Sequence, residues 1–283
     1  MMKEQNNVFR TLIFDRQVSL TLADTTEIVR EAIRLHKLSP SSACVLGKAL
    51  SVMTFASAAL NMEQGEISLS LQSDGLGGNV GVSGNYDLRL RGYIDNTQAN
   101  GSEQQTLGEN GALTIVRDDG YRRPFVGTCA LPGVGGVDAA FEEYYAKSEQ
   151  LPTYIQSCVQ LNEQGECTFA GVAVMQPLPF AEEDVLGVCA NFPLNELLED
   201  MQKLPLEKVA TAHFTTNEQA NGYKKAEYKC NCSKDYLSRV LATISQDELR
   251  TIVKEDGAVR VHCHYCNTDY AFNEEDINAL FNK

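Results

Sequence analysis

Four cysteines near the end of the sequence stand in two close pairs, a spacing that suits a metal ion. The first pair is the C-x-C of Cys230 and Cys232, and the second is the C-x-x-C of Cys263 and Cys266. Zinc prefers four ligands in a tetrahedron, and soft thiolate sulfurs suit it. The intervening chain can bring the two pairs together, so we predict that these four thiols bind one zinc ion.

The residues around the second pair leave other chemistry to weigh. A thiol–disulfide oxidoreductase places its C-x-x-C at the start of a helix, where the helix dipole lowers the pKa of the nucleophilic thiol. Here Val259 and Val261 predict a strand leading into Cys263, which favours metal binding over thiol exchange. His262 and His264 alternate with Cys263 along that strand, so we expect them at the surface and not among the ligands.

The remaining thiols and glycines indicate structure rather than catalysis. The other cysteines are scattered through apolar patterns typical of small buried residues. They are Cys44, Cys129, Cys158, Cys167 and Cys189. The glycine-rich stretch 74–84 lacks the Gly-Lys-Ser/Thr ending of a phosphate loop. With no hydrolase elbow, paired-carboxylate site or nucleotide motif recognised, we predict that the protein is not an enzyme.

The composition limits the kinds of partner and the cellular compartment that we expect for this protein. The chain has 283 residues and a formal net charge of −14, which argues against nucleic acid as a partner. The longest apolar-leaning stretch, 49–60, is too short to span a bilayer, so we expect a core helix and no membrane. The nine cysteines are an odd number and no secretory signal is evident, which favours a reducing cytoplasm.

Residues 1–178 are predicted to form one α+β domain with helices and a largely antiparallel sheet. Alternating apolar residues predict strands, and longer periodic runs predict helices. The expected strands lie within 12–22, 66–94, 113–126 (a hairpin turning at Asp119-Gly120), 155–161 and 167–176. Three helices are expected. The first starts at a capping box of Asp24 and Glu27, the second runs from Ser39-Pro40 to about Leu60, and the third covers 138–148.

Two further regions succeed this domain. Residues 179–228 are predicted to be a helical linker of low stability, with a polar loop over 215–225. Its apolar face cannot stabilise a short helix in isolation and needs docking. That face comprises Leu194, Leu197, Leu198 and Met201. Residues 229–283 contain few large apolar side chains, so we expect this unit to need a metal, a disulfide or a partner in order to fold.

At these residues the chain resembles the heat-shock protein 33 family, the redox-regulated chaperonins of bacteria. Its terminal cysteine pattern, Cys230-Asn-Cys232-Ser233 with Cys263-His-Tyr-Cys266, is similar to that family's zinc domain. Landmarks of the family extend the resemblance over nearly the whole chain. They are Arg91-Gly92-Tyr93, Gly127, Tyr144 through Gln150, Ala170-Gly171 and Gln176 through Pro179.

The resemblance implies a redox-regulated holdase that works without ATP. The reduced, zinc-bound form would be inactive. Oxidation would form the disulfides Cys230–Cys232 and Cys263–Cys266, release zinc, unfold the linker and allow a homodimer to hold unfolding client proteins. The alternative is a constitutive zinc-dependent binding module whose cysteines are purely structural.

Overall fold

The computed structural model describes residues 6–281 and divides the chain into two compact units, Met1–Lys229 and Cys230–Lys283. The first unit combines helices with two sheets that are antiparallel except at one edge, which confirms the predicted α+β class. Residues 179–228, expected as a separate linker, pack within the first unit.

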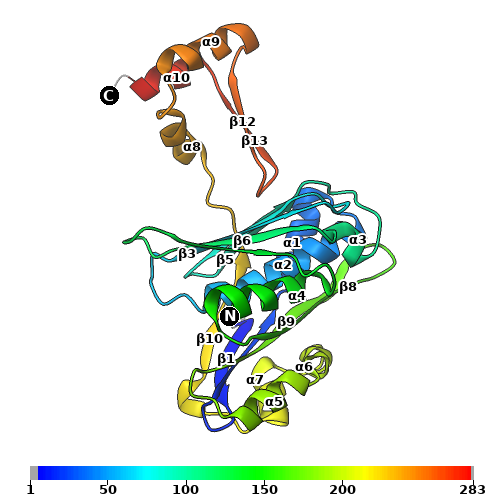
Figure 1. The fold of residues 1–283 in the computed structure, drawn as a ribbon. Helices are drawn as coiled ribbons and strands as arrows, with labels where there is room; N and C mark the ends of the chain where they lie inside the picture. Colours follow the sequence, from blue (N-terminus) through cyan, green and yellow to red (C-terminus); the bar gives the residue numbers. More distant parts are fainter. Residues whose placement is uncertain (1–5, 282–283) are drawn as a thin grey trace, which may run out of the picture. The chain divides into compact units, whose positions relative to one another are not determined.

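Two sheets form the frame of the first unit (Figure 1). The five-stranded sheet has the order β10 (Gly222–Lys224), β1 (Val8–Ile13), β2 (Val18–Asp24), β9 (Cys167–Pro177) and β8 (Tyr154–Leu161). The six-stranded sheet has the order β11 (Glu227–Tyr228), β5 (Arg89–Ile94), β4 (Val80–Asn85), β3 (Glu66–Ser73), β6 (Gly111–Asp118) and β7 (Phe125–Ala130). Only β11 runs parallel to its neighbour, β5, among the described pairs of strands.

A helical layer fills the space between these sheets. Helix α2 (Pro40–Ala58) contacts strands of both sheets, and α1 (Thr26–His36) packs beside it. The shorter helices α3 (Glu103–Leu107) and α4 (Gly136–Tyr144) also contact α2. By length and composition alone α2 is the one helix within residues 6–281 that could cross a membrane, but 83% of the tested window is buried. The predicted core helix is therefore confirmed, and it is longer than the apolar stretch suggested.

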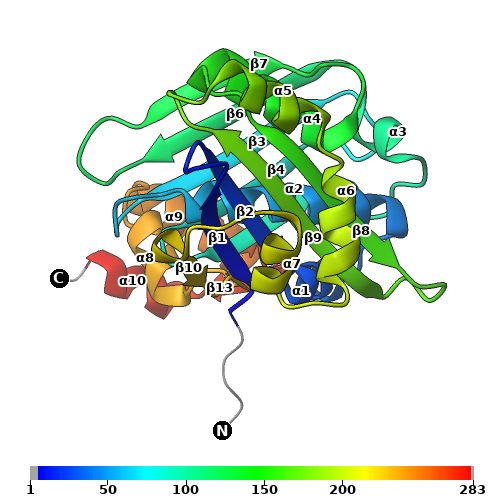
Figure 2. The same cartoon turned by 90° about the horizontal axis from the view of Figure 1, so that it is seen from below.

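Three short helices cover the outer face of the five-stranded sheet (Figure 2). They are α5 (Glu183–Asn191), α6 (Leu194–Met201) and α7 (Leu206–His213). All four apolar residues predicted on one face of α6 are buried, and they pack against Phe9, Leu20 and Leu22 of β1 and β2. Because helices cover this sheet on both faces, β2 is buried at six consecutive positions and lacks the expected alternation.

The expected loop over 215–225 is partly wrong. A short 3₁₀ helix, Glu218–Ala220, and strand β10 lie within it, and β11 comes shortly after. Asn7 fixes the chain between these strands, since its amide donates to the carbonyl of Ala226 at 3.1 Å and accepts from Ala226 N at 2.7 Å. The Tyr228 hydroxyl donates to Gly92 O at 2.9 Å and accepts from Gly92 N at 3.2 Å.

Several local predictions need correction. The strand expected over 12–22 is two strands, because Phe14, Asp15 and Arg16 turn the chain with positive φ angles and without a glycine. The capping box at Asp24 is also wrong. Thr25 is the N-cap, and Asp24 accepts a hydrogen bond from Thr26 N at 2.9 Å instead.

Two further elements differ in detail from expectation. The hairpin of β6 and β7 is present, but residues 119–124 join its strands instead of a two-residue turn. The helix expected over 138–148 ends its regular part at Tyr144 and continues as one π-helical turn, Tyr145–Glu149. The apolar period is similar in both helix types over so short a span, so the sequence pattern did not distinguish them.

The second unit is a small arrangement of short elements. It contains α8 (Lys234–Leu241), α9 (Gln246–Asp256), β12 (Val259–Cys263), β13 (Thr268–Phe272) and α10 (Glu274–Phe281), of which α10 was not predicted. Ser233 and Ser245 cap α8 and α9 by accepting from backbone N–H groups, and Gly257 ends α9 in the left-handed region. The buried apolar residues are Leu241, Leu249, Val259, Phe272 and Ile277.

Candidate metal centre

The two cysteine pairs lie on two short segments of the second unit. Cys230 and Cys232 stand in the extended chain just before α8. Cys263 ends β12, and Cys266 lies in the turn to β13. The turn closes because Asn267 adopts a positive φ of 52° and donates from its backbone N to Cys263 O at 2.8 Å. A pair of tight segments thus presents the sulfurs from opposite sides.

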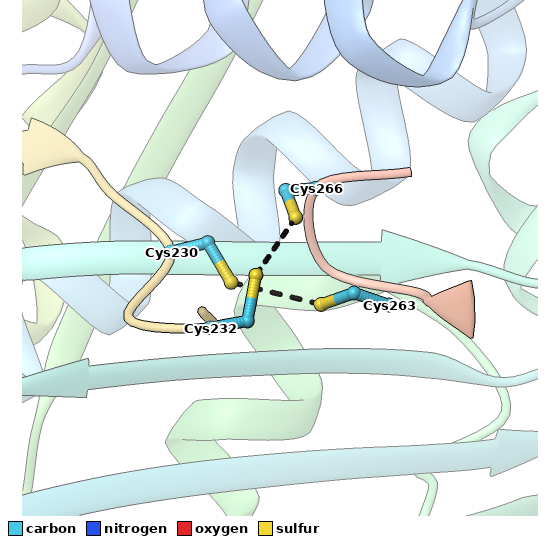
Figure 3. Close-up of side chains that lie close together, drawn as sticks. All are labelled: Cys230, Cys232, Cys263 and Cys266. Atoms are coloured by element: carbon cyan, nitrogen blue, oxygen red, sulfur yellow. Dashed lines mark hydrogen bonds between the residues drawn. The ribbon is translucent and has the colours of Figure 1, made fainter. Parts of the chain in front are cut away.

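The structure brings all four predicted ligands together (Figure 3). Their Sγ atoms all lie within 4.8 Å of one another. Cys230 Sγ is 3.7 Å from Cys263 Sγ, and Cys232 Sγ is 3.1 Å from Cys266 Sγ. Both of these contacts join residues of different pairs, so the arrangement depends on both segments being held at once.

This donor set fits a tetrahedral thiolate metal site. Zinc–sulfur bonds of about 2.3 Å in a tetrahedron require sulfurs about 3.8 Å apart. The Cys230–Cys263 distance of 3.7 Å matches that edge, the Cys232–Cys266 distance of 3.1 Å is shorter, and all the sulfurs lie within 4.8 Å of one another. All four cysteines are partly buried.

Three of the clustered thiols, Cys230, Cys232 and Cys266, differ in their tendency to ionise when no metal is bound. Burial opposes ionisation of Cys232, but hydrogen bonds from Tyr270 and the other thiols outweigh it and lower the pKa of Cys232 to about 7. Burial is the main cause that raises the pKa of Cys266 to about 11, and it also raises the pKa of Cys230. Ionisation is therefore favoured at Cys232 and opposed at Cys230 and Cys266, where a bound cation would stabilise the thiolate forms.

Tyr270 is a neighbour that the sequence analysis did not assign to the site. Its hydroxyl lies 3.2 Å from Cys232 Sγ. The alternation of β13 places it on the side of the sulfurs, but alternation by itself does not tell which face holds a metal. Such a hydroxyl orients and stabilises a thiolate ligand from outside the ligand set.

His262 and His264 are exposed, as predicted, and neither belongs to the sulfur cluster. His262 Nδ1 lies 2.7 Å from Asp269 Oδ1, and the two imidazole rings are 5.2 Å apart. Of the scattered cysteines, Cys129, Cys167 and Cys189 are buried as expected, whereas Cys44 and Cys158 are only partly buried. Burial raises the pKa of Cys189 to about 11, which keeps that thiol protonated and unreactive.

The fold is an α+β domain followed by a small terminal unit, and the four converging thiols of that unit could hold a metal ion. A family model described as "Hsp33 protein" matches residues 6–273. The chain therefore belongs to the Hsp33 family of chaperones.

Individual relatives agree with this assignment. The chain is 28% identical to a protein named "33 kDa chaperonin" from Clostridium perfringens (strain SM101), covering 97% of this chain and 91% of the relative. A protein of the same name from Acetivibrio thermocellus is 28% identical, covering 98% and 97%. The crystal structure of the 33 kDa chaperonin of Thermotoga maritima has the same fold, with a TM-score of 0.82 and 24% identity over 98% of each chain. Membership of this family supports a chaperone function.

Proposed function

We propose that this protein is a redox-regulated holdase chaperone that works without ATP and is inactive while Cys230, Cys232, Cys263 and Cys266 hold zinc. The observation that carries the proposal is the placement of four sulfurs within 4.8 Å in a unit whose described core has only five buried apolar residues. In such small units, metal binding and folding are one process. A reaction that removes the metal from these sulfurs would therefore unfold the unit.

Zinc, when bound, keeps these sulfurs as thiolates, the form that oxidants attack. In each pair two thiolates give up two electrons and form one S–S bond, while one peroxide takes up those electrons and two protons and leaves as two water molecules. Two pairs thus consume two peroxides. The products, Cys230–Cys232 and Cys263–Cys266, have no thiolates left for a metal.

Pairing within each segment also decides whether the oxidised unit stays open. A disulfide between segments, such as Cys230–Cys263, closes a long loop and stabilises the fold by about 3–4 kcal/mol in the chain-entropy model. The short-range disulfides close tiny loops and do not hold the segments together. We expect peptide mapping of the oxidised protein to find the short-range pairs; a dominant Cys232–Cys263 or Cys230–Cys263 bond contradicts this step.

Release of the second unit is proposed to loosen residues 179–228, which immediately precede it in the chain. Helices α5, α6 and α7 have eight or nine residues each, and isolated helices of that length are marginal in water. They depend on the apolar cluster that they share with the five-stranded sheet, including Leu197, Val209 and Met175. Undocking exposes this apolar surface, which captures unfolding client proteins and supports an oxidised homodimer.

The test is light scattering of a client protein that unfolds on heating. The client is mixed either with the reduced protein or with protein treated with peroxide, and released zinc is measured in the same sample. We expect suppression of aggregation only after zinc is released. A matched control is Cys44→Ser, which removes a thiol outside the cluster and should respond like the wild type.

Two alternatives give different results in the same experiment. A constitutive zinc-dependent binding module resists peroxide, retains its metal and gains no client binding. A thiol oxidoreductase turns over in an insulin-reduction assay, where we expect no turnover because the cysteine pair comes after a strand and not at a helix start.

A further inference from the structure

One hollow of the first unit has an unusual charge for so acidic a protein. It has a volume of about 460 Å³, and its charged lining residues are Arg10 and Lys224, with no Asp or Glu among them. Polar lining comes from Thr11, Ser19 and Asn61. The whole chain carries a formal net charge of −14, so a hollow lined by basic residues without acidic ones is unexpected.

The pairing of β1 with β10 places the two cations on one face. Val8 is opposite Lys224, and Arg10 is opposite Gly222. Arg10 and Lys224 are therefore diagonal neighbours on the same side of the two strands, a separation that long side chains can span. The opposite side carries the ring contact of Phe9 with Tyr223, whose centroids are 5.2 Å apart.

Neither cation has a carboxylate partner within ion-pair distance among residues 6–281. The guanidinium of Arg10 donates from Nη1 to the carbonyl of Ala58 at 2.8 Å, which leaves its other donors for a ligand. Lys224 Nζ lies over the ring of Tyr86, 4.6 Å from its centroid. Asp87 acts on Lys224 only from a distance and pairs instead with Arg89 Nη2 at 3.7 Å.

Two like charges in a partly buried hollow destabilise the fold unless an anion joins them. Burial lowers the pKa of Arg10, and burial together with the charge of Arg10 lowers the pKa of Lys224. Buried charges in proteins are normally paired, and an unpaired arginine fork suits a planar or tetrahedral oxyanion.

We propose that Arg10 and Lys224 bind a small phosphate-type oxyanion in this hollow and that the bound anion bridges β1 to β10. Arginine supplies a fork of donors and lysine a compact charge, so both contact different oxygens of one ligand. The hollow is larger than one phosphate, which leaves room for the remainder of a phosphorylated small molecule.

The neighbouring hollow serves as an internal comparison. It has a volume of about 420 Å³ and also borders Arg10, but it contains Asp118, Asp119 and Glu149. Its second arginine, Arg117, is already paired with Glu149 at 3.1 Å. Its acidic lining repels an anion, so the ligand belongs on the Lys224 side of Arg10.

Binding is tested on the full, reduced, zinc-loaded protein by isothermal titration with inorganic phosphate at constant ionic strength. We expect saturable binding that weakens about tenfold in Lys224→Gln, the effect of losing one charge-assisted contact. Lys208→Gln is the matched control, since it removes the same charge from an exposed position of the same segment. Absent saturable binding, or equal loss in both variants, overturns the proposal.

Further titrations define the ligand class. Adenosine monophosphate that binds more tightly than phosphate identifies the phosphate of a larger molecule as the ligand, whereas equal or weaker binding identifies the free ion. Acetate that binds as tightly as phosphate contradicts the phosphate class. Arg10→Lys keeps the charge but removes the fork of donors, so this variant should also weaken binding. Lys224→Gln remains the main test, because Lys224 lies on the edge strand and its replacement leaves the rest of the sheet intact.

A regulatory consequence rests on the proposed function. Lys224 belongs to the segment that is proposed to loosen on oxidation, so a bound anion should stabilise the resting state by mass action. Peroxide activation should then be slower in saturating phosphate for the wild type and unaffected in Lys224→Gln. Binding without such slowing retains the anion site and rejects only its link to the switch.

Discussion

The first unit buries two large apolar clusters on both sides of its five-stranded sheet, whereas the described core of the second consists of five buried apolar residues beside four thiols. Apolar burial of about 25 cal/mol per Å² holds a large domain without help, but a unit of this size rarely gains enough from it. The size of its core therefore decides whether a unit can fold by apolar burial alone or depends on additional bonds.

The largest effect that tests this comparison is metal removal. Chelation under reducing conditions should unfold Cys230–Lys283, because metal binding in small zinc units is worth about 10–16 kcal/mol. Hydrogen exchange should show lost protection in β12, β13 and α9, with α2 and β9 of the first unit still protected. Retained protection in the second unit contradicts the idea that a metal holds it together.

Truncation of a core residue in each unit should separate the two further. Phe272→Ala and Leu50→Ala each remove a fully buried side chain and cost about 2–5 kcal/mol. In the second unit this loss should appear as weaker zinc affinity, measured by competition with a chromophoric chelator.

The Leu50→Ala variant is the control for that experiment. It should lower the thermal transition of the first unit and leave zinc affinity unchanged. Equal effects of both variants on zinc affinity are incompatible with two independent cores.

Truncation in a linker helix should weaken its docking to the five-stranded sheet. Leu197 is fully buried between α6 and the five-stranded sheet, so Leu197→Ala should weaken docking by about 2–5 kcal/mol. We expect client binding at lower peroxide concentration than for the wild type, measured by light scattering. Val188→Ala, at an α5 position that is 47% exposed, should leave the peroxide response unchanged.

The smallest effect concerns a surface carboxylate of the first unit. Asp74 accepts hydrogen bonds from the Asn110 side chain and from the backbone N–H groups of Asn110 and Glu109, and these lower its pKa from the ordinary 3.8. A lowered pKa means that this stabilisation is present above pH 3.8 and disappears as the pH falls through the folded value. Asp74→Ala should therefore lower the urea midpoint slightly at pH 7, with a smaller difference from the wild type at pH 3. A gap of the same size at both pH values refutes this assignment.

The helices with a clear start signal or a clear apolar periodicity could be predicted from the sequence. Ser39-Pro40 marked the start of α2, and the apolar face of α6 was identified residue by residue. The four thiols were predictable as a group because their spacing carries chemistry regardless of the surrounding fold.

Features set by tertiary contacts were not predictable. The turn at Phe14, Asp15 and Arg16 has no glycine or proline, and pairing of its flanking strands forces the positive φ angles. Strand β10 is three residues long and polar, so only its partner β1 reveals it. Tyr270 and Lys224 likewise gain their roles from neighbours distant in sequence.

Strands β10 and β11 end shortly before Lys229, the last residue of the first unit, and each is the outermost strand of a different sheet. Detachment of this one segment uncovers the backbone N–H and C=O groups of β1 and β5 together. Such groups are common to every polypeptide and can pair with any extended chain. Exposed strand edges of this kind would pair with an extended chain through its backbone alone, whatever the side chains of that chain.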